Sequence, residues 1–115
     1  MNRTIPVKPD SPYSIAYFSM EVGLMPSMPT YSGGLGILAG DTLKAAADLE
    51  IPLVGVTLLH RKGYFLQHLD PQGGQTESPS EWNPRDFLEL VDTEVTIQIE
   101  GRTIHIRAWR YLIEG

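Results

Sequence analysis

The sequence predicts an α/β fold in which a strand–helix–strand unit is followed by a C-terminal β-hairpin. Three features support this prediction: two short apolar runs of strand-forming residues, an amphipathic stretch between them, and two alternating segments near the end of the chain. The chain has 115 residues, 42% of them hydrophobic and 20% charged, as is typical of one folded domain with a single core. We expect an N-terminal arm over residues 1–10 and one incomplete domain over residues 11–115.

The two apolar runs, residues 13–20 and 53–59, are almost free of charged and polar side chains. Such runs are typical of strands in parallel sheets, so we expect both strands to be covered on both faces. Between them, residues 35–49 repeat apolar side chains with the i, i+3, i+4 spacing of an amphipathic helix. Pro52 disfavours helical geometry at the residue before it, so the helix is expected to end near Glu50. The predicted apolar face consists of Leu35, Leu38, Ala39, Leu43, Ala46, Ala47 and Leu49.

The remainder of the chain predicts strands and turns. Residues 64–69 are a candidate strand that ends in the turn signal of residues 70–74, and residues 78–86 are expected to form a polar loop. Residues 95–99 and 103–107 alternate apolar and polar side chains, which predicts the C-terminal hairpin.

Charge and composition argue against several classes of function. A formal net charge of −5 provides no broad basic surface for nucleic acid or an anionic membrane. No stretch approaches the ~20 apolar residues needed to cross a bilayer, so a cytoplasmic protein is expected. The chain has no cysteine, and the spacing of His60, His68 and His105 does not match a metal site, so no metal is expected.

The glycine-rich segment at residues 32–36, Ser-Gly-Gly-Leu-Gly, stands where the predicted helix begins. In a strand–helix–strand unit this loop lies at the carboxyl end of the sheet, where α/β proteins bind ligands. Free N–H groups at a helix start attract anions, and glycines let a phosphate approach the backbone. The alternative is that Gly33 and Gly34 serve only a tight turn and that Gly36 allows close helix packing. The segment matches neither the phosphate loop of nucleoside triphosphatases nor the dinucleotide-binding fingerprint.

Other polar and aromatic residues have simpler interpretations beside the functional ones. Glu21 follows the first strand and could orient a sugar hydroxyl or a cationic side chain, or could be a solvated or capping carboxylate. Asp41 and Lys44 are expected to pair on the exposed side of the helix. Core or subunit contacts are expected for Trp82 and for the aromatic pair Tyr64-Phe65, with a platform for a sugar ring as the alternative.

Five segments together resemble the start of the bacterial short-type α-glucan phosphorylases, which are related to glycogen and maltodextrin phosphorylase. These segments are residues 15–21 (IAYFSME), 29–41 (PTYSGGLGILAGD), 52–56 (PLVGV), 61–65 (RKGYF) and 81–84 (EWNP). The resemblance runs from about Ser14 to Gly115. The Gly-Gly-Leu-Gly piece alone is shared with glycogen and starch synthases, which carry a lysine where this chain has Tyr31.

The resemblance implies a fold and a reaction. Phosphorylases have the two-domain GT-B fold, with catalysis between two Rossmann-like halves, and this chain would form part of the N-terminal half. They use inorganic phosphate to remove a terminal glucose from an α-1,4-glucan, giving glucose 1-phosphate. Their cofactor, pyridoxal phosphate, is bound mainly by the second half.

The resemblance also implies site residues. By position, the loop residues Gly33, Gly34 and Leu35 would bind substrate and phosphate. Gly33 and Gly34 would also face the phosphate group of the cofactor. Glu21 would be a supporting catalytic residue. Gly23 stands where longer glycogen phosphorylases have a tyrosine against the cofactor, a departure from their pattern.

The lysine that anchors the family's cofactor, its basic phosphate-binding cluster and its second Rossmann-like half match nothing in this chain. We therefore expect the isolated chain to be inactive and to bind no cofactor. Its expected partners are α-1,4-glucan and inorganic phosphate, together with a second copy of itself or a missing C-terminal half. Two other functions stay open, namely a sugar-nucleotide-dependent glucan synthase domain and a non-catalytic glucan-binding or interaction module.

Overall fold

The computed structural model describes residues 14–114, which divide into two compact units. The first unit runs to Trp82 and includes the residues from Ile113 onward, and the second is Asn83–Leu112. The predicted arm over residues 1–10 lies outside the described residues. In chain order the elements are β1 (Ile15–Phe18), α1 (Gly34–Asp48), β2 (Leu53–Val56), β3 (Phe65–Leu69), β4 (Gln75–Pro79), the 3₁₀ helix η1 (Pro84–Asp86), β5 (Glu89–Ile99) and β6 (Arg102–Arg110).

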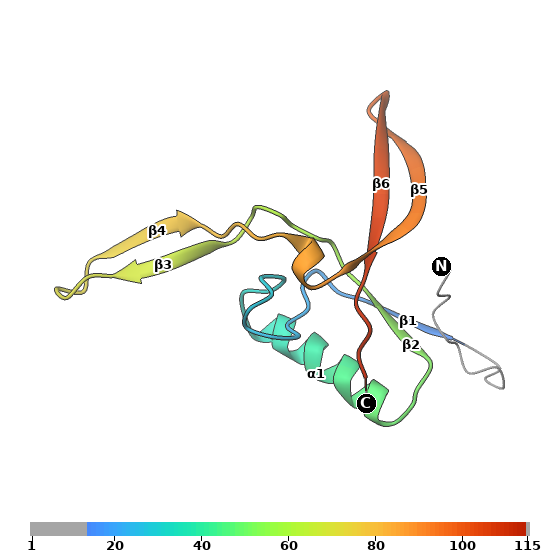
Figure 1. The fold of residues 1–115 in the computed structure, drawn as a ribbon, viewed down its shortest axis with the longest axis horizontal. Helices are drawn as coiled ribbons and strands as arrows, with labels where there is room; N and C mark the ends of the chain where they lie inside the picture. Colours follow the sequence, from blue (N-terminus) through green and yellow to red (C-terminus); the bar gives the residue numbers. More distant parts are fainter. Residues whose placement is uncertain (1–13, 115) are drawn as a thin grey trace. The chain divides into compact units, whose positions relative to one another are not determined.

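The predicted strand–helix–strand unit is confirmed. β1 and β2 pair in parallel, with Ile15 opposite Leu53 and Phe18 opposite Val56. Figure 1 shows the two strands side by side, with α1 as the connection between them. Both strands are shorter than predicted. The paired residues run from Ile15 and Leu53 to Phe18 and Val56.

The prediction that both strands are covered on both faces is wrong for this structure. The helix packs on one face of the sheet, where Tyr17 and Leu53 contact the buried residues Val22, Ala39 and Leu43. The opposite direction is open, and Phe18 keeps 76% of its surface exposed. A single helix against two strands can cover only one face of the sheet.

The buried side of α1 differs from the predicted apolar face. It consists of Gly36, Ala39, Gly40, Leu43 and Ala46. Leu35 and Leu49, which were predicted to be buried, are 64% and 71% exposed, and Leu38 is exposed as well. The apolar pattern was too wide, because it counted every aliphatic side chain and omitted the glycines that lie in the contact.

Those glycines allow the loop between β1 and α1 to lie directly against the helix. The amide of Gly23 donates to the carbonyl oxygen of Gly36 at 2.7 Å. A Cβ atom added at Gly40 would collide with the carbonyl oxygen of Gly23, and one at Gly36 would collide with the side chain of Tyr31. Gly36 therefore permits close packing, as one of the sequence-based interpretations proposed.

The helix ends as predicted, close to Glu50. Glu50 has a positive φ of 53° and donates its amide to the carbonyl of Ala47 at 3.0 Å. The amide of Ile51 donates to the carbonyl of Ala46 at 2.9 Å. This pair of bonds is a Schellman motif, in which a left-handed residue reverses the chain at the helix end.

The predicted strand over residues 64–69 is present as β3, but its partner β4 was not predicted. β3 and β4 pair antiparallel, with Phe65 opposite Pro79 and Leu69 opposite Gln75. The turn between them is held by Asp70, whose Oδ1 accepts from the amides of Gln72 and Gly74. β4 has no hydrophobic alternation, so its strand geometry follows from the turn and from backbone pairing with β3.

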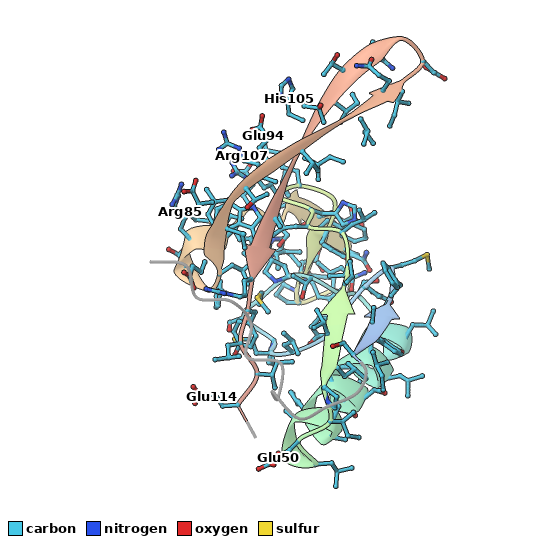
Figure 2. The ribbon with its side chains drawn as sticks, turned by 90° about the vertical axis from the view of Figure 1, so that its right-hand side faces the viewer. Glu50, Arg85, Glu94, His105, Arg107 and Glu114 are labelled. Atoms are coloured by element: carbon cyan, nitrogen blue, oxygen red, sulfur yellow. The ribbon has the colours of Figure 1, made fainter. Side chains whose placement is uncertain are left out.

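In the second unit, the predicted C-terminal hairpin is confirmed and is longer than expected. Glu100 and Gly101 both have positive φ, at 50° and 75°, as in the two-residue turns that suit the twist of a hairpin. Figure 2 shows Glu94, His105 and Arg107 on the same side of this hairpin. Glu94 accepts from His105 Nδ1 at 2.7 Å and from Arg107 Nε at 2.9 Å, bonds that lower the pKa of its carboxyl group. The other side carries exposed aliphatic residues, among them Val95, Ile97, Ile99, Ile104 and Ile106.

Substitution of Gly40 by alanine is predicted to destabilise the first unit by about 1–3 kcal/mol, because the added Cβ meets a backbone atom that cannot rotate away. Urea unfolding followed by helical circular dichroism measures this loss. Gly34→Ala is the matched control on the same helix, since a Cβ there meets nothing within 4 Å. Equal stability of the two variants would contradict the close contact between Gly40 and Gly23.

The exposed apolar residues of α1 are predicted to make the isolated chain self-associate. Sedimentation velocity over a range of concentrations should show species larger than the monomer. Replacing both Leu38 and Leu49 by glutamine should shift the distribution towards the monomer, whereas Lys44→Gln, on the same helix, should not. A monodisperse monomer at all concentrations would refute this prediction.

Candidate functional site

The glycine loop presents three consecutive free backbone amides. Gly33 is the residue directly before α1. Its backbone is extended, with φ −156° and ψ −165°, and no side chain caps the helix. Within the described residues, the amides of Gly33, Gly34 and Leu35 have no hydrogen-bond partner, whereas the amide of Gly36 already bonds the carbonyl of Gly33. The first turn of α1 contains no acidic residue. These amides, at the positive end of the helix dipole, are suited to an anion.

The conformation of the loop does not require glycine at residues 33 and 34. Neither residue has a positive φ. A Cβ at either position would meet no atom within 4 Å. The tight-turn interpretation of Gly33 and Gly34 is therefore not supported, and the lack of a side chain leaves the amides open to an approaching group.

Glu21 lies against this loop, as its position after β1 suggested. Its Oε2 accepts a hydrogen bond of 2.7 Å from the amide of Ser32, the residue directly before the three free amides. Its Cδ lies 3.3 Å from the place that a Cβ on Gly36 would occupy. This bond to a backbone amide corresponds to the capping carboxylate among the sequence-based interpretations, and the role in orienting a sugar hydroxyl or a cationic side chain stays a prediction.

Two further bonds join the ends of the loop between β1 and α1. The amide of Val22 donates to the carbonyl of Thr30 at 3.1 Å, and the Thr30 hydroxyl donates to the carbonyl of Val22 at 2.6 Å. Ser19 Oγ donates to the carbonyl of Glu21 at 2.8 Å. The backbone of Glu21 is thus held by bonded residues on either side.

Tyr31 has a structural role that the sequence did not reveal. Its ring lies 3.0 Å from the position of a Cβ on Gly23, and its Cβ occupies the space beside Gly36. The partly buried ring packs on these two glycines and carries no positive charge, unlike a lysine at this position. The sequence signal that could have predicted this packing is a large aromatic residue, Tyr31, with the glycines Gly23 and Gly36 on either side of it in the chain.

Tyr64, for which the sequence favoured a core or subunit contact over a sugar platform, lies within reach of the charge of Glu21. Partial burial and the negative charge of Glu21 raise the pKa of the Tyr64 hydroxyl above its usual value, so it stays protonated at neutral pH. The ring of His60 meets the ring of Tyr64 edge on, with 6.2 Å between centroids. Trp82 Nε1 donates to the carbonyl of His60 at 2.8 Å, which gives this tryptophan a structural contact within the first unit, in line with one of its expected roles.

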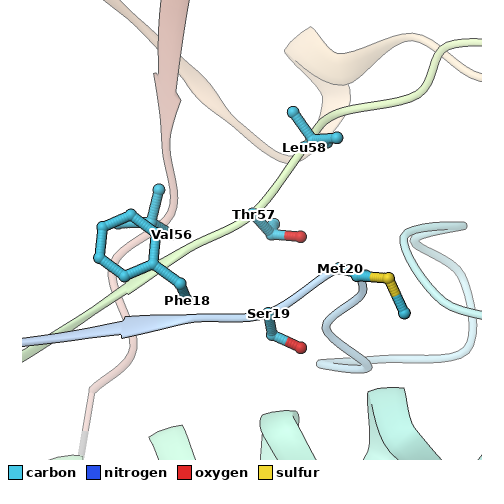
Figure 3. A pocket seen from close by; sticks show the side chains of 6 residues that line it. All are labelled: Phe18, Ser19, Met20, Val56, Thr57 and Leu58. Atoms are coloured by element: carbon cyan, nitrogen blue, oxygen red, sulfur yellow. The ribbon is translucent and has the colours of Figure 1, made fainter.

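A shallow apolar hollow of about 480 Å³ lies at the carboxyl ends of the two parallel strands. It is lined by Phe18, Ser19, Met20, Val56, Thr57 and Leu58 (Figure 3). The hollow contains no ionisable side chain and is open to solvent, so it offers a packing surface and no acid or base.

The two described lysines are exposed, and the structure shows no contact between either of them and the glycine loop. Lys62 pairs with Glu81 at 3.2 Å, both largely exposed, and Lys44 is exposed on α1. Among residues 14–114, no group of three or more His, Asp or Glu side chains could hold a metal ion. In the same range, no helix has the length and apolar character needed to span a membrane.

Sequence comparison finds relatives of this chain among curated proteins. It is 43% identical over 102 residues to maltodextrin phosphorylase of Thermococcus litoralis, an alignment that covers 83% of this chain and 12% of that protein. It is 53% identical over 74 residues to glycogen phosphorylase of Mycobacterium tuberculosis, covering 64% and 9%. It is 35% identical over 88 residues to glycogen phosphorylase of Aquifex aeolicus, covering 76% and 12%. No protein-family model and no solved structure matches the chain.

These relatives define the class of the chain as a segment of a phosphorylase. Within that class, the chain is homologous to an N-terminal segment of the glycogen and maltodextrin phosphorylases. It spans about a tenth of the length of these relatives.

Proposed function

We propose that this chain supplies the phosphate-binding glycine loop of an α-glucan phosphorylase. The observation that carries the proposal is the set of three free amides at Gly33, Gly34 and Leu35, at the start of α1 and open to solvent. The names of the relatives support glycogen or a maltodextrin as the substrate class. The proposal extends to the partial Rossmann-like half of a GT-B fold over residues 11–115, to an arm over residues 1–10 and to a cytoplasmic location.

In the proposed reaction, the bond between C1 of the terminal glucose and O4 of the next glucose breaks. A bond forms between C1 and an oxygen of inorganic phosphate, and the proton of the phosphate ends on the departing O4. The loop amides would donate hydrogen bonds to the phosphate oxygens, and the helix dipole would stabilise their charge. The role of the segment is thus to bind and orient phosphate.

The same loop fits the phosphate group of the pyridoxal phosphate that the family resemblance implies. The absence of Cβ atoms at Gly33 and Gly34 leaves room for phosphate oxygens close to the backbone. When bound, this cofactor supplies an acid–base group beside the substrate phosphate. Lys62 pairs with Glu81 and Lys44 is exposed on α1, so neither is proposed to anchor the cofactor.

The glucan synthase alternative has less support. In this structure Tyr31 packs on Gly23 and Gly36, and no cation stands at that position to bind a nucleotide-sugar phosphate. A non-catalytic glucan-binding or interaction module stays as the second candidate.

Gly34→Ala should lower phosphorolysis by at least about tenfold, equivalent to roughly 1.4 kcal/mol of transition-state stabilisation, since its methyl group would occupy the approach to the amides. The measurement uses a chimera in which this segment replaces the matching one of the Mycobacterium tuberculosis glycogen phosphorylase. The melting temperature of the chimera should change little, because the added Cβ meets no neighbour. Unchanged activity per folded molecule would remove Gly34 from the site.

The isolated chain should produce no glucose 1-phosphate from glycogen, phosphate and pyridoxal phosphate. The reason is that the lysine and the basic cluster that the family resemblance implies match nothing in this chain, and that Lys62, of the two described lysines, is paired with Glu81. An enzyme-coupled assay for glucose 1-phosphate, with absorption spectra of the added cofactor, tests this expectation. Product above background, or a cofactor band that disappears on substitution of one lysine, would show the prediction to be wrong.

A further inference from the structure

The carboxylate of Glu21 bonds a backbone amide that no other described residue holds. The Val22 and Thr30 bonds close the loop between β1 and α1 two residues before Ser32. Beyond Thr30, Tyr31 is fixed by its contacts with Gly23 and Gly36, whereas Ser32 is exposed. Among the described residues, the 2.7 Å bond from the Ser32 amide to Glu21 Oε2 is the last hydrogen bond made by a backbone amide before the three free amides begin.

The backbone of Glu21 is held by hydrogen bonds. Its carbonyl accepts from Ser19 Oγ, and the next residue, Val22, is bonded to Thr30 in both directions. The carboxyl carbon lies over Gly36, where a side chain would collide with it or with Tyr31. Because the Glu21 backbone is held, the charge-assisted bond from the Ser32 amide to its carboxylate also restrains Ser32.

We propose that Glu21 is the positioning residue of the glycine loop, holding Ser32 so that the amides of Gly33, Gly34 and Leu35 stay unpaired and face a common anion. The inference rests on the proposed phosphate-binding function. It assigns to Glu21 a role exerted through the backbone, without contact with the reacting atoms. Its negative charge beside the loop opposes anion binding, so its contribution comes from the bond and not from the charge.

Two substitutions separate the bond from the charge. Glu21→Gln removes the charge but keeps an oxygen that can accept from the Ser32 amide, whereas Glu21→Ala removes both. Asp41→Ala, at an exposed position of α1, is the control for loss of one negative charge on the same unit. The probe is inorganic phosphate at constant ionic strength, added to the 115-residue chain.

Amide chemical shifts of the glycine loop report binding, and hydrogen exchange of the Ser32 amide reports the bond. We expect Glu21→Gln to bind phosphate at least as tightly as the wild type, and Glu21→Ala to bind at least about threefold more weakly than Glu21→Gln. Exchange of the Ser32 amide should be at least about tenfold faster in Glu21→Ala than in the wild type, with Glu21→Gln closer to the wild type. Asp41→Ala should leave Ser32 exchange unchanged.

Equal phosphate affinity and equal Ser32 exchange in the alanine and glutamine variants would overturn the proposal. If phosphate shifts no loop amide in the wild type, the proposed phosphate-binding function fails, and Ser32 exchange alone then decides whether Glu21 positions the loop. Circular dichroism of each variant verifies that α1 is intact. If Glu21→Ala fails to fold, the comparison of Glu21→Gln with the wild type still tests the role of the charge. A large rise in the exchange rate of the Ser32 amide in Glu21→Gln would then contradict the proposal that the hydrogen bond, and not the charge, positions the loop.

Discussion

The backbone contact between Gly23 and α1 is the constraint on which the rest of the first unit depends. The amide of Gly23 bonds the carbonyl of Gly36, and its carbonyl oxygen lies against Gly40 with no room for a side chain. This contact brings the loop after β1 onto the helix that leads to β2. Because the loop is held there, Glu21 reaches Ser32, and the start of α1 stands beside the end of β1.

The glycines between residues 33 and 40 look like one motif in the sequence but have different physical roles. Gly36 and Gly40 face inward and allow two backbones to approach. Gly33 and Gly34 face open space, and neither has the positive φ that would make glycine necessary for a turn. Neither steric contact nor backbone conformation requires these two glycines, which agrees with the proposal that a ligand approaches the backbone here.

Within the described residues the buried core is small and the exposed apolar surface is large. Val22, Ala39 and Leu43 form the centre of the buried cluster, while aliphatic side chains of α1, the strand ends and the C-terminal hairpin are exposed. The relatives are about ten times longer than the aligned segment. A two-stranded sheet with one helix leaves one face of the sheet open, and the unpaired strand edges remain accessible to further elements.

The sequence by itself determined the strand–helix–strand unit, the limits of the helix, the C-terminal hairpin and the family, because periodicity, turn residues and motifs are local signals. It also placed Glu21 and the glycine loop near one another, through the topology of the unit. Only the tertiary structure decided that Leu35 and Leu49 lie outside the contact and that the glycines lie within it. The tertiary structure also decided the presence of β4 and the bond between Glu21 and Ser32. Strand β4 depends on backbone pairing with β3, and the Glu21 bond depends on the backbone amide of Ser32, and a hydrophobic pattern does not record contacts made by backbone atoms.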